Sequence, residues 1–203
     1  MTTDVEPINL KTIRGWARRT AVVDRATYRS KTRPVTPRRL WRMVAPNLRQ
    51  PIFLVGAPRS GTTFVGASLS VLPQLSYHFE PVIIRAAARY VYDQQWSFRK
   101  ARRFYRRVYS WLMRLHLDGD LILAEKTPRN SLVMGFLYQA FPDARFIHII
   151  RDGRDAALSL AKQSWFQSAQ AHTGNRGADG YLQGPRARFW IEPDRVTEYE
   201  TTS

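Results

Sequence analysis

A glycine-bounded stretch, GAPRSGTT at residues 56–63, carries the residue types that bind a phosphate group. Glycine lets the backbone curl, so that successive N–H groups converge on an anion. The hydroxyls of Thr62 and Thr63 can donate to phosphate oxygens, and Arg59 places a fixed positive charge beside them. The pattern predicts an anion-binding loop whose binding residues are Arg59, Ser60, Gly61, Thr62 and Thr63.

The spacing of the two flanking glycines indicates which kind of phosphate the loop suits. Gly56 and Gly61 match the Walker A frame, but Thr62 stands where that frame has its lysine. Because the lysine bridges the β- and γ-phosphates of ATP or GTP, its loss argues against an ordinary nucleotide-hydrolysing site and favours a terminal phosphate. A P-loop small-molecule kinase and a ligand-free turn between strand and helix are the alternatives.

Strands and helices alternate around this loop. Short apolar or β-branched runs predict strands at 51–55, 121–124 and 145–150. Helical spacing of apolar residues predicts helices at 61–72, 82–93, 98–116, 129–140 and 152–163. Such alternation is typical of βαβ units with a parallel sheet. We therefore expect a single α/β domain of P-loop type, with a three-layer αβα architecture.

The sequence divides into three segments. Residues 1–50 form a basic N-terminal extension with short helices, residues 51–163 form the nucleotide-binding core, and residues 164–203 form an irregular tail with little periodicity. Lys and Arg number 32 against 16 acids, which gives a formal net charge of +16. A chain of this charge attracts anions, but charge alone does not choose among phosphates, sulfates, nucleic acid and a membrane surface. The basic extension and the Arg-rich face of the 98–116 helix are therefore either solvated or in contact with an anionic partner.

A second stretch, FPDARFIHIIRDGRDAALSL at residues 141–160, joins a predicted strand to a predicted helix. Together with GAPRSGTT it resembles sulfotransferases that use 3′-phosphoadenosine 5′-phosphosulfate (PAPS), and it is closest in pattern to their bacterial and tyrosylprotein-type members. The resemblance covers roughly residues 51–163. It implies transfer of a sulfuryl group from PAPS to a hydroxyl or amine acceptor. Family members usually continue further beyond the second motif, so the chain is expected to be C-terminally shortened.

The resemblance also implies a role for individual residues. GAPRSGTT would hold the 5′-phosphosulfate, while Arg151 at the strand end and Ser159 in the next helix would hold the 3′-phosphate. Glu80 in YHFEP would be the general base, and Lys126 in AEKTPRN would face the sulfuryl group beside Arg59. PAPS is then a co-substrate.

Each of these roles has a competing interpretation. His78 is an alternative base, Glu80 could be a helix-start acid, and Lys126 could be a surface lysine. Arg151 could instead pair with Asp155. A non-catalytic or fragmentary domain that binds nucleotides or other anions is the alternative function.

The remaining composition narrows the chemistry. The chain has no cysteine, so disulfides and thiolate nucleophiles are excluded. No grouping of His with carboxylates in the sequence suggests a metal, and His148 is expected to pack inside the sheet. We find no signal peptide or membrane span, which favours a cytoplasmic protein with possible peripheral membrane contact through its basic segments. The expected partner is a small-molecule, carbohydrate or lipid acceptor, and no specific nucleic acid.

Overall fold

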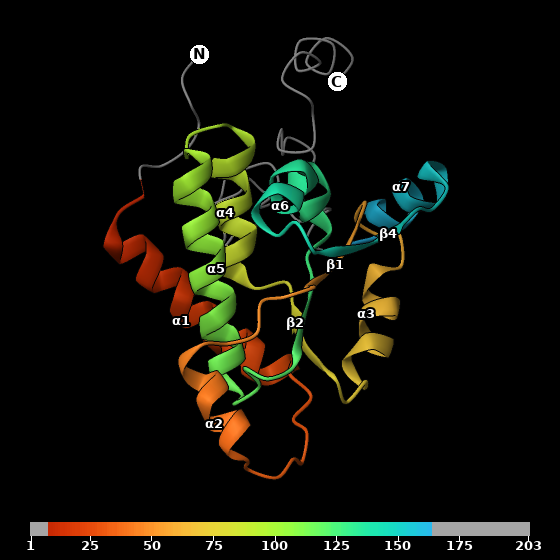
Figure 1. Ribbon diagram of the computed structural model, residues 1–203. Coiled ribbons are helices and arrows are strands. Elements are labelled where there is room, and N and C mark those ends of the chain that lie inside the picture. Colours follow the sequence, from red (N-terminus) through yellow and green to blue (C-terminus); the bar gives the residue numbers. More distant parts are fainter. Residues whose placement is uncertain (1–7, 164–203) are drawn as a thin grey trace.

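The computed structural model describes residues 8–163, and Figure 1 shows their arrangement. The sequence-predicted tail at 164–203 lies outside the described residues, as do residues 1–7. The strands are β1 (Ile52–Gly56), β2 (Leu75–Phe79), β3 (Ile122–Lys126) and β4 (Arg145–Ile149). Within the described part of the chain they form one parallel sheet in the order β2-β3-β1-β4. The predicted α/β class with a parallel sheet is confirmed.

Helices cover both faces of this sheet. Figure 1 shows α1, α4 and α5 on one side and α3 on the other. The helices are α1 (Leu10–Thr27), α2 (Pro37–Val44), α3 (Thr62–Ser70), α4 (Val82–Tyr92), α5 (Phe98–Leu115), the 3-10 helix η1 (Pro128–Val133), α6 (Met134–Ala140) and α7 (Gly153–Ala161). The predicted helix at 129–140 is thus split into a 3-10 turn and a short α-helix.

The strand side chains alternate between two apolar clusters. Phe53 and Val55 of β1 pack into the larger cluster with α4 and α5, whereas Ile52 packs into the smaller one with Leu75 and Ala124. Successive side chains of a strand point to opposite faces, so a sheet with helices on both faces needs apolar residues at consecutive positions. This requirement accounts for the continuous run IFLV in β1.

The N-terminal segment differs from expectation. Where short helices of a solvated extension were predicted, α1 is 18 residues long, and Asn9 caps its start by accepting a hydrogen bond from the Thr12 backbone. Trp16, Thr20 and Asp24 recur at every fourth position and are buried. Their stripe packs against α4 and β2, so residues 10–27 belong to the folded core.

The edge strand β4 is less covered than predicted. His148 was expected to pack inside the sheet, but it is exposed. The reason is position, because β4 pairs with β1 alone among the described strands and its side chains are exposed or half-buried.

Candidate active site at the carboxyl edge of the sheet

The sheet order places the predicted site residues in a row. Parallel strands end at the same edge, and in open α/β sheets ligands bind outside the carboxyl ends of the strands. Along this edge lie Glu80 after β2, Lys126 at the end of β3, the 56–63 loop after β1, and Arg151 after β4. The register pairs Phe79 with Lys126, which sets Glu80 one residue beyond the lysine.

The glycine-rich loop leads directly into α3. Gly61 has φ +96°, a left-handed conformation that glycine adopts without strain, and it precedes the first residue of the helix. Ser60 and Thr62 are buried while Thr63 is exposed. Backbone N–H groups at a helix N-terminus attract anions, so the loop has the geometry of an anion site.

Gly66 lets helix α3 pack close to the sheet. A Cβ atom at Gly66 would lie 2.0 Å from the hydroxyl oxygen of Tyr77 on β2. A side chain at this position would require Tyr77 to move, so glycine lets α3 pack close to β2 beneath the loop.

The two motifs predicted to bind phosphates are in direct contact. The Arg59 Nε donates to the Ser159 Oγ at 3.1 Å, and the Arg151 Nη1 donates to the Arg59 carbonyl oxygen at 3.2 Å. Arg151 also lies 3.9 Å from the Asp155 carboxylate, so the competing ion pair is present as a loose contact. Residues about a hundred positions apart therefore gather basic and hydroxyl groups at one place.

The other end of the row is a carboxylate–ammonium pair. The Lys126 Nζ donates to the Glu80 Oε1, and the Arg85 Nη1 lies 3.4 Å from the Glu80 Oε2. The side chain of Lys126 is 1% exposed and that of Glu80 is 22% exposed. The ammonium also lies 4.3 Å from the centre of the Phe79 ring. Lys126 is thus not the surface lysine of the competing interpretation.

Glu125 is a buried carboxyl group that sequence reasoning missed. It accepts hydrogen bonds from the hydroxyl of Thr127, from the Asn130 Nδ2 at 2.7 Å and from the Tyr109 hydroxyl at 3.5 Å. Burial raises its pKa to about 8, although the Thr127 bond acts in the opposite direction. Glu125 therefore ties the turn after Lys126 to α5. Its position directly before Lys126 in AEKTPRN was the one feature of the sequence that could have pointed to it.

A buried polar cluster lies on the face of the sheet covered by α1. The Asp24 Oδ1 and His78 Nδ1 are 2.8 Å apart, and the Asp24 Oδ2 and His116 Nε2 are 2.6 Å apart. Since a carboxylate only accepts, each imidazole N–H donates. The other nitrogen of His78 lies 3.0 Å from the Ser76 Oγ. Both ring nitrogens are engaged, so we do not assign His78 as the base.

The same cluster corrects the expectation that His and carboxylate groups would not gather. One ligand atom each of Asp24, His78 and His116 lies within 4.8 Å of the others, and these residue types bind transition metals. Their mutual hydrogen bonds already account for the arrangement. The residues come from α1, β2 and the end of α5, so their proximity is a product of the fold.

Asp24→Asn is expected to lower the free energy of unfolding by about 2 kcal/mol at pH 7. Burial acts to raise the pKa of Asp24, but the hydrogen bonds from His116 and His78 outweigh it and lower the pKa to about 2. A lowered folded-state pKa gives stability that is present above the ordinary value near 4 and is lost as the pH falls toward 2. Urea titration of wild type and variant measures the difference.

Asp93→Asn is the matched control for this substitution. Asp93 forms an i,i+4 pair with Arg89 in which both side chains are partly exposed, unlike the buried Asp24, and i,i+4 pairs on helices are worth only a few tenths of a kcal/mol. If Asp24→Asn lowered the free energy of unfolding by no more than the few tenths of a kcal/mol expected for Asp93→Asn, the Asp24 cluster would not stabilise the fold.

The chain matches one protein-family model and is similar to a protein of known sequence. A family model described as the sulfotransferase family matches residues 51–196. A protein of Aquifex aeolicus (strain VF5), named only as an uncharacterized protein, is 30% identical over 132 residues. These residues cover 58% of this chain and 17% of the relative, so the chain spans less than a fifth of that protein's length. No solved structure matches the chain.

The family match extends past residue 163, the end expected from the motifs, into residues that the structure does not describe. Among residues 8–163, none of the helices combines the length and the apolar character needed to cross a bilayer.

Proposed function

The chain belongs to the sulfotransferase family, and on that premise we propose that it transfers a sulfuryl group from PAPS to a hydroxyl or amine acceptor. One observation carries the proposal. The 56–63 loop is in contact with Arg151 and Ser159, and it lies at the same edge of the sheet as the Glu80–Lys126 pair; this arrangement supports a transfer in which these groups take part.

The donor would be held by its two phosphate ends. The 56–63 loop, with Arg59 and the backbone N–H groups at the start of α3, suits the 5′-phosphosulfate. Arg151 and Ser159 suit the 3′-phosphate, because they supply a fixed cation and a hydroxyl donor. The contacts of both with Arg59 support placing the two phosphate ends side by side.

The transfer then requires one proton acceptor and charge stabilisation. As the acceptor oxygen or nitrogen bonds to sulfur, its proton goes to the Glu80 carboxylate. The bond between sulfur and the bridging phosphate oxygen breaks, and adenosine 3′,5′-bisphosphate leaves with that electron pair. Lys126 and Arg59 offset the charge that develops on the sulfuryl and phosphate oxygens. In-line geometry makes positioning a large part of the rate.

We propose an acceptor that carries a free hydroxyl or amine. A small molecule, a carbohydrate or a lipid with a free hydroxyl or amine meets the chemistry of Glu80. A non-catalytic nucleotide-binding domain is the second candidate, and nucleotide binding without transfer to any acceptor would favour it.

The test of the donor site is calorimetric titration with adenosine 3′,5′-bisphosphate. We expect wild type to bind the bisphosphate and not ATP, and Arg151→Ala to bind it about 10- to 100-fold more weakly, because one charge-assisted contact is lost. Arg154→Ala is the matched control, since Arg154 is exposed and pairs with Asp152. A folded wild type that bound ATP but no bisphosphate would overturn the PAPS site and favour the kinase.

A further inference from the structure

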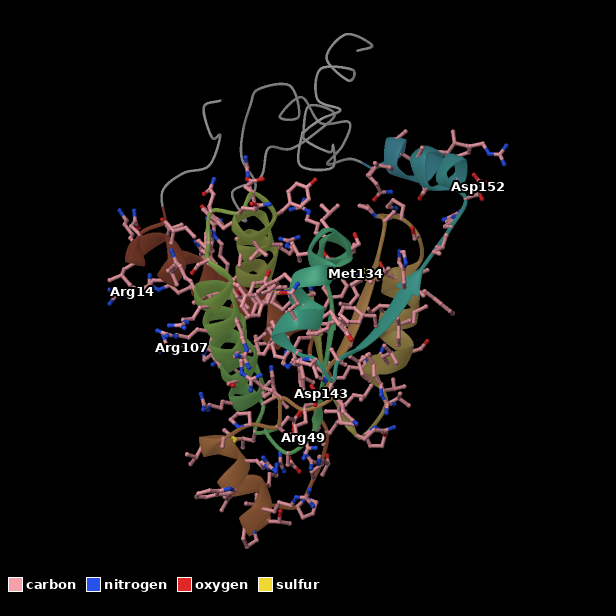
Figure 2. The ribbon with its side chains drawn as sticks, turned by 45° about the horizontal axis from the view of Figure 1, so that its top comes forward. Arg14, Arg49, Arg107, Met134, Asp143 and Asp152 are labelled. Carbon is pink, nitrogen blue, oxygen red and sulfur yellow. The ribbon has the colours of Figure 1, made fainter. Side chains whose placement is uncertain are left out.

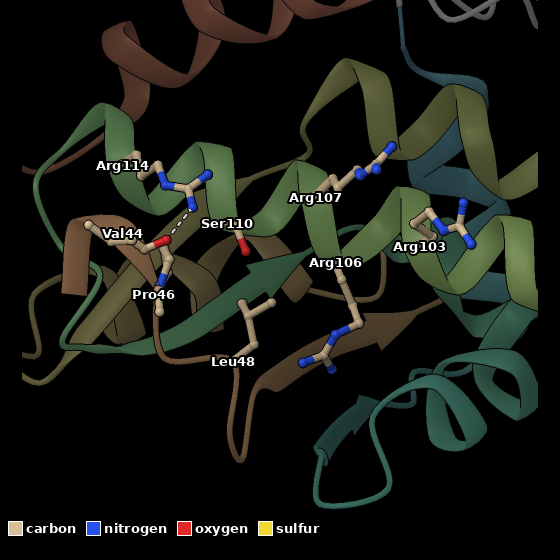
Figure 3. Close-up of a pocket in the computed structure, with 9 residues that line it drawn as sticks. Val44, Pro46, Leu48, Arg103, Arg106, Arg107, Ser110 and Arg114 are labelled. Atoms are coloured by element: carbon tan, nitrogen blue, oxygen red, sulfur yellow. Dashed lines mark hydrogen bonds between the residues drawn. The ribbon is translucent and has the colours of Figure 1, made fainter. Parts of the chain in front are cut away.

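A second basic surface lies away from the candidate active site, on α5 and the end of α2. A groove of about 390 Å³ lies there, lined by Arg103, Arg106, Arg107 and Arg114 on one side and by the segment 44–48 on the other (Figure 3). Helix α5 contains no Asp or Glu. Among residues 8–163, Arg103, Arg106 and Arg107 are exposed and none of them makes an ion pair with an acid, although the Arg106 guanidinium also lies 5.5 Å from the centre of the Phe141 ring.

The arginine surface continues into an exposed apolar one. Leu40, Trp41 and Val44 of α2 are 57%, 68% and 68% exposed. They share one side of this short helix, while Arg39 on the other side is buried and donates to the carbonyl oxygens of Leu117 and Arg33. Val44 belongs to both surfaces, since it also lines the groove.

Arg114 holds the two surfaces in a fixed relation. Its Nε donates to the Met43 carbonyl oxygen at 2.7 Å. Its Nη2 donates to the Val44 carbonyl oxygen, also at 2.7 Å (Figure 3). These carbonyls end α2, where a cation is favourable to the helix dipole. The exposed apolar side of α2 is therefore docked beside the arginines of α5.

We infer that this surface binds a membrane containing anionic phospholipids. The headgroup phosphates would bind Arg103, Arg106 and Arg107. The apolar side chains of Leu40, Trp41 and Val44 would insert at the boundary between the headgroups and the acyl chains. Arginine beside exposed tryptophan and aliphatic residues is typical of helices that lie in the membrane interface. A polyanion such as RNA would use the arginines but gives no reason to expose Leu40 and Val44. The contact leaves the carboxyl edge of the sheet open, because α2 lies at the far end of the molecule in Figure 1.

The test is cosedimentation of the full chain with vesicles of phosphatidylcholine alone and with added phosphatidylglycerol. We expect binding only to the anionic vesicles. Arg103→Glu/Arg106→Glu/Arg107→Glu should weaken it on the order of a hundredfold, at about a factor of five per arginine. Leu40→Ser/Trp41→Ser should weaken it on the order of tenfold by removing the apolar insertion.

Two control variants lie away from the surface. Arg145→Glu/Arg154→Glu/Lys162→Glu changes the net charge equally, and these exposed residues lie on β4, on α7 and just after α7. Figure 2 shows nearby Asp152 on the opposite side of the molecule from Arg107. Phe64→Ser removes an equally exposed aromatic side chain on α3. Both should bind as wild type does.

The outcomes separate the membrane from other polyanions. Failure of wild type to bind the anionic vesicles overturns the proposal. So does binding that Leu40→Ser/Trp41→Ser leaves unchanged while RNA or heparin binds with equal strength, since the surface would then recognise charge alone. A thermal melt of each variant confirms that it is folded.

Discussion

Glu80→Gln should bind adenosine 3′,5′-bisphosphate as wild type does and lose about 10²- to 10⁴-fold in kcat, the usual contribution of a general base. The amide keeps the shape of the carboxylate but cannot accept the acceptor's proton. The effect should fall on kcat, since the proton moves only in the transition state. The measurement is transfer of radiolabelled sulfuryl from PAPS to an acceptor found by screening, together with calorimetry of the nucleotide.

Arg85→Gln separates the base from its neighbourhood. Arg85 lies 3.4 Å from the same carboxylate, so this variant disturbs the surroundings of Glu80 but leaves the proton acceptor in place. We expect a change in kcat of less than about tenfold, because the carboxylate keeps its pairing with Lys126. A wild-type kcat in Glu80→Gln would overturn the assignment of Glu80 as the base. Equal losses of kcat in Glu80→Gln and Arg85→Gln would indicate that Glu80 only positions other groups.

Much of the site could be predicted because its signals are local. The loop at 56–63 is defined by glycine spacing within eight residues, and the strand before it and helix after it carry their own apolar patterns. The same holds for residues 145–161, where a β-branched strand leads into a helix capped by Asp152. Once the strands are known to be parallel, their carboxyl ends must share an edge. The row of predicted residues follows from that geometry.

What could not be predicted depends on contacts between distant segments. Strand β2 was missed because Ser76 and His78 read as polar, yet both are fully buried. Their burial is possible only because Asp24, on a helix 54 residues earlier, supplies a hydrogen-bond partner to His78. The length of α1 was underestimated for the same reason, since its buried stripe includes Thr20 and Asp24.

Backbone strain is a further property that the sequence does not reveal. Arg59 and Glu80 have φ of +68° and +41°, in the left-handed region that costs a side-chain-bearing residue roughly 1–2 kcal/mol. Glu80 begins the row and Arg59 lies in the loop after the interior strand β1, each at a turn between a strand and a helix. Strain of this kind persists where the surroundings over-determine the conformation, and it clusters at functional sites. The Glu80 N–H bond to the Lys126 carbonyl, at 2.8 Å, is one such constraint.

Lys126→Met should lower kcat by about 10²- to 10³-fold, the effect of removing one preorganised electrostatic group from a transition state. Methionine retains an unbranched apolar chain against Phe79 but carries no charge. The loss should fall on kcat more than on nucleotide affinity, because the charge that Lys126 offsets develops during transfer. Lys162→Met is the matched control, since it makes the same substitution at an exposed position.

The double variant Glu80→Gln/Lys126→Met tests whether the pair acts as a unit. Because the ammonium donates directly to the carboxylate, each single variant also disturbs the other residue. The combined loss in kcat should then be smaller than the product of the two single losses, as for residues in contact. Full multiplicativity would mean that each residue acts on the transition state alone. If Lys126→Met lost activity and Lys126→Arg kept it, the positive charge itself would be the required feature. A purely packing role for the buried lysine predicts instead that Lys126→Met keeps activity and that the bulkier Lys126→Arg loses it.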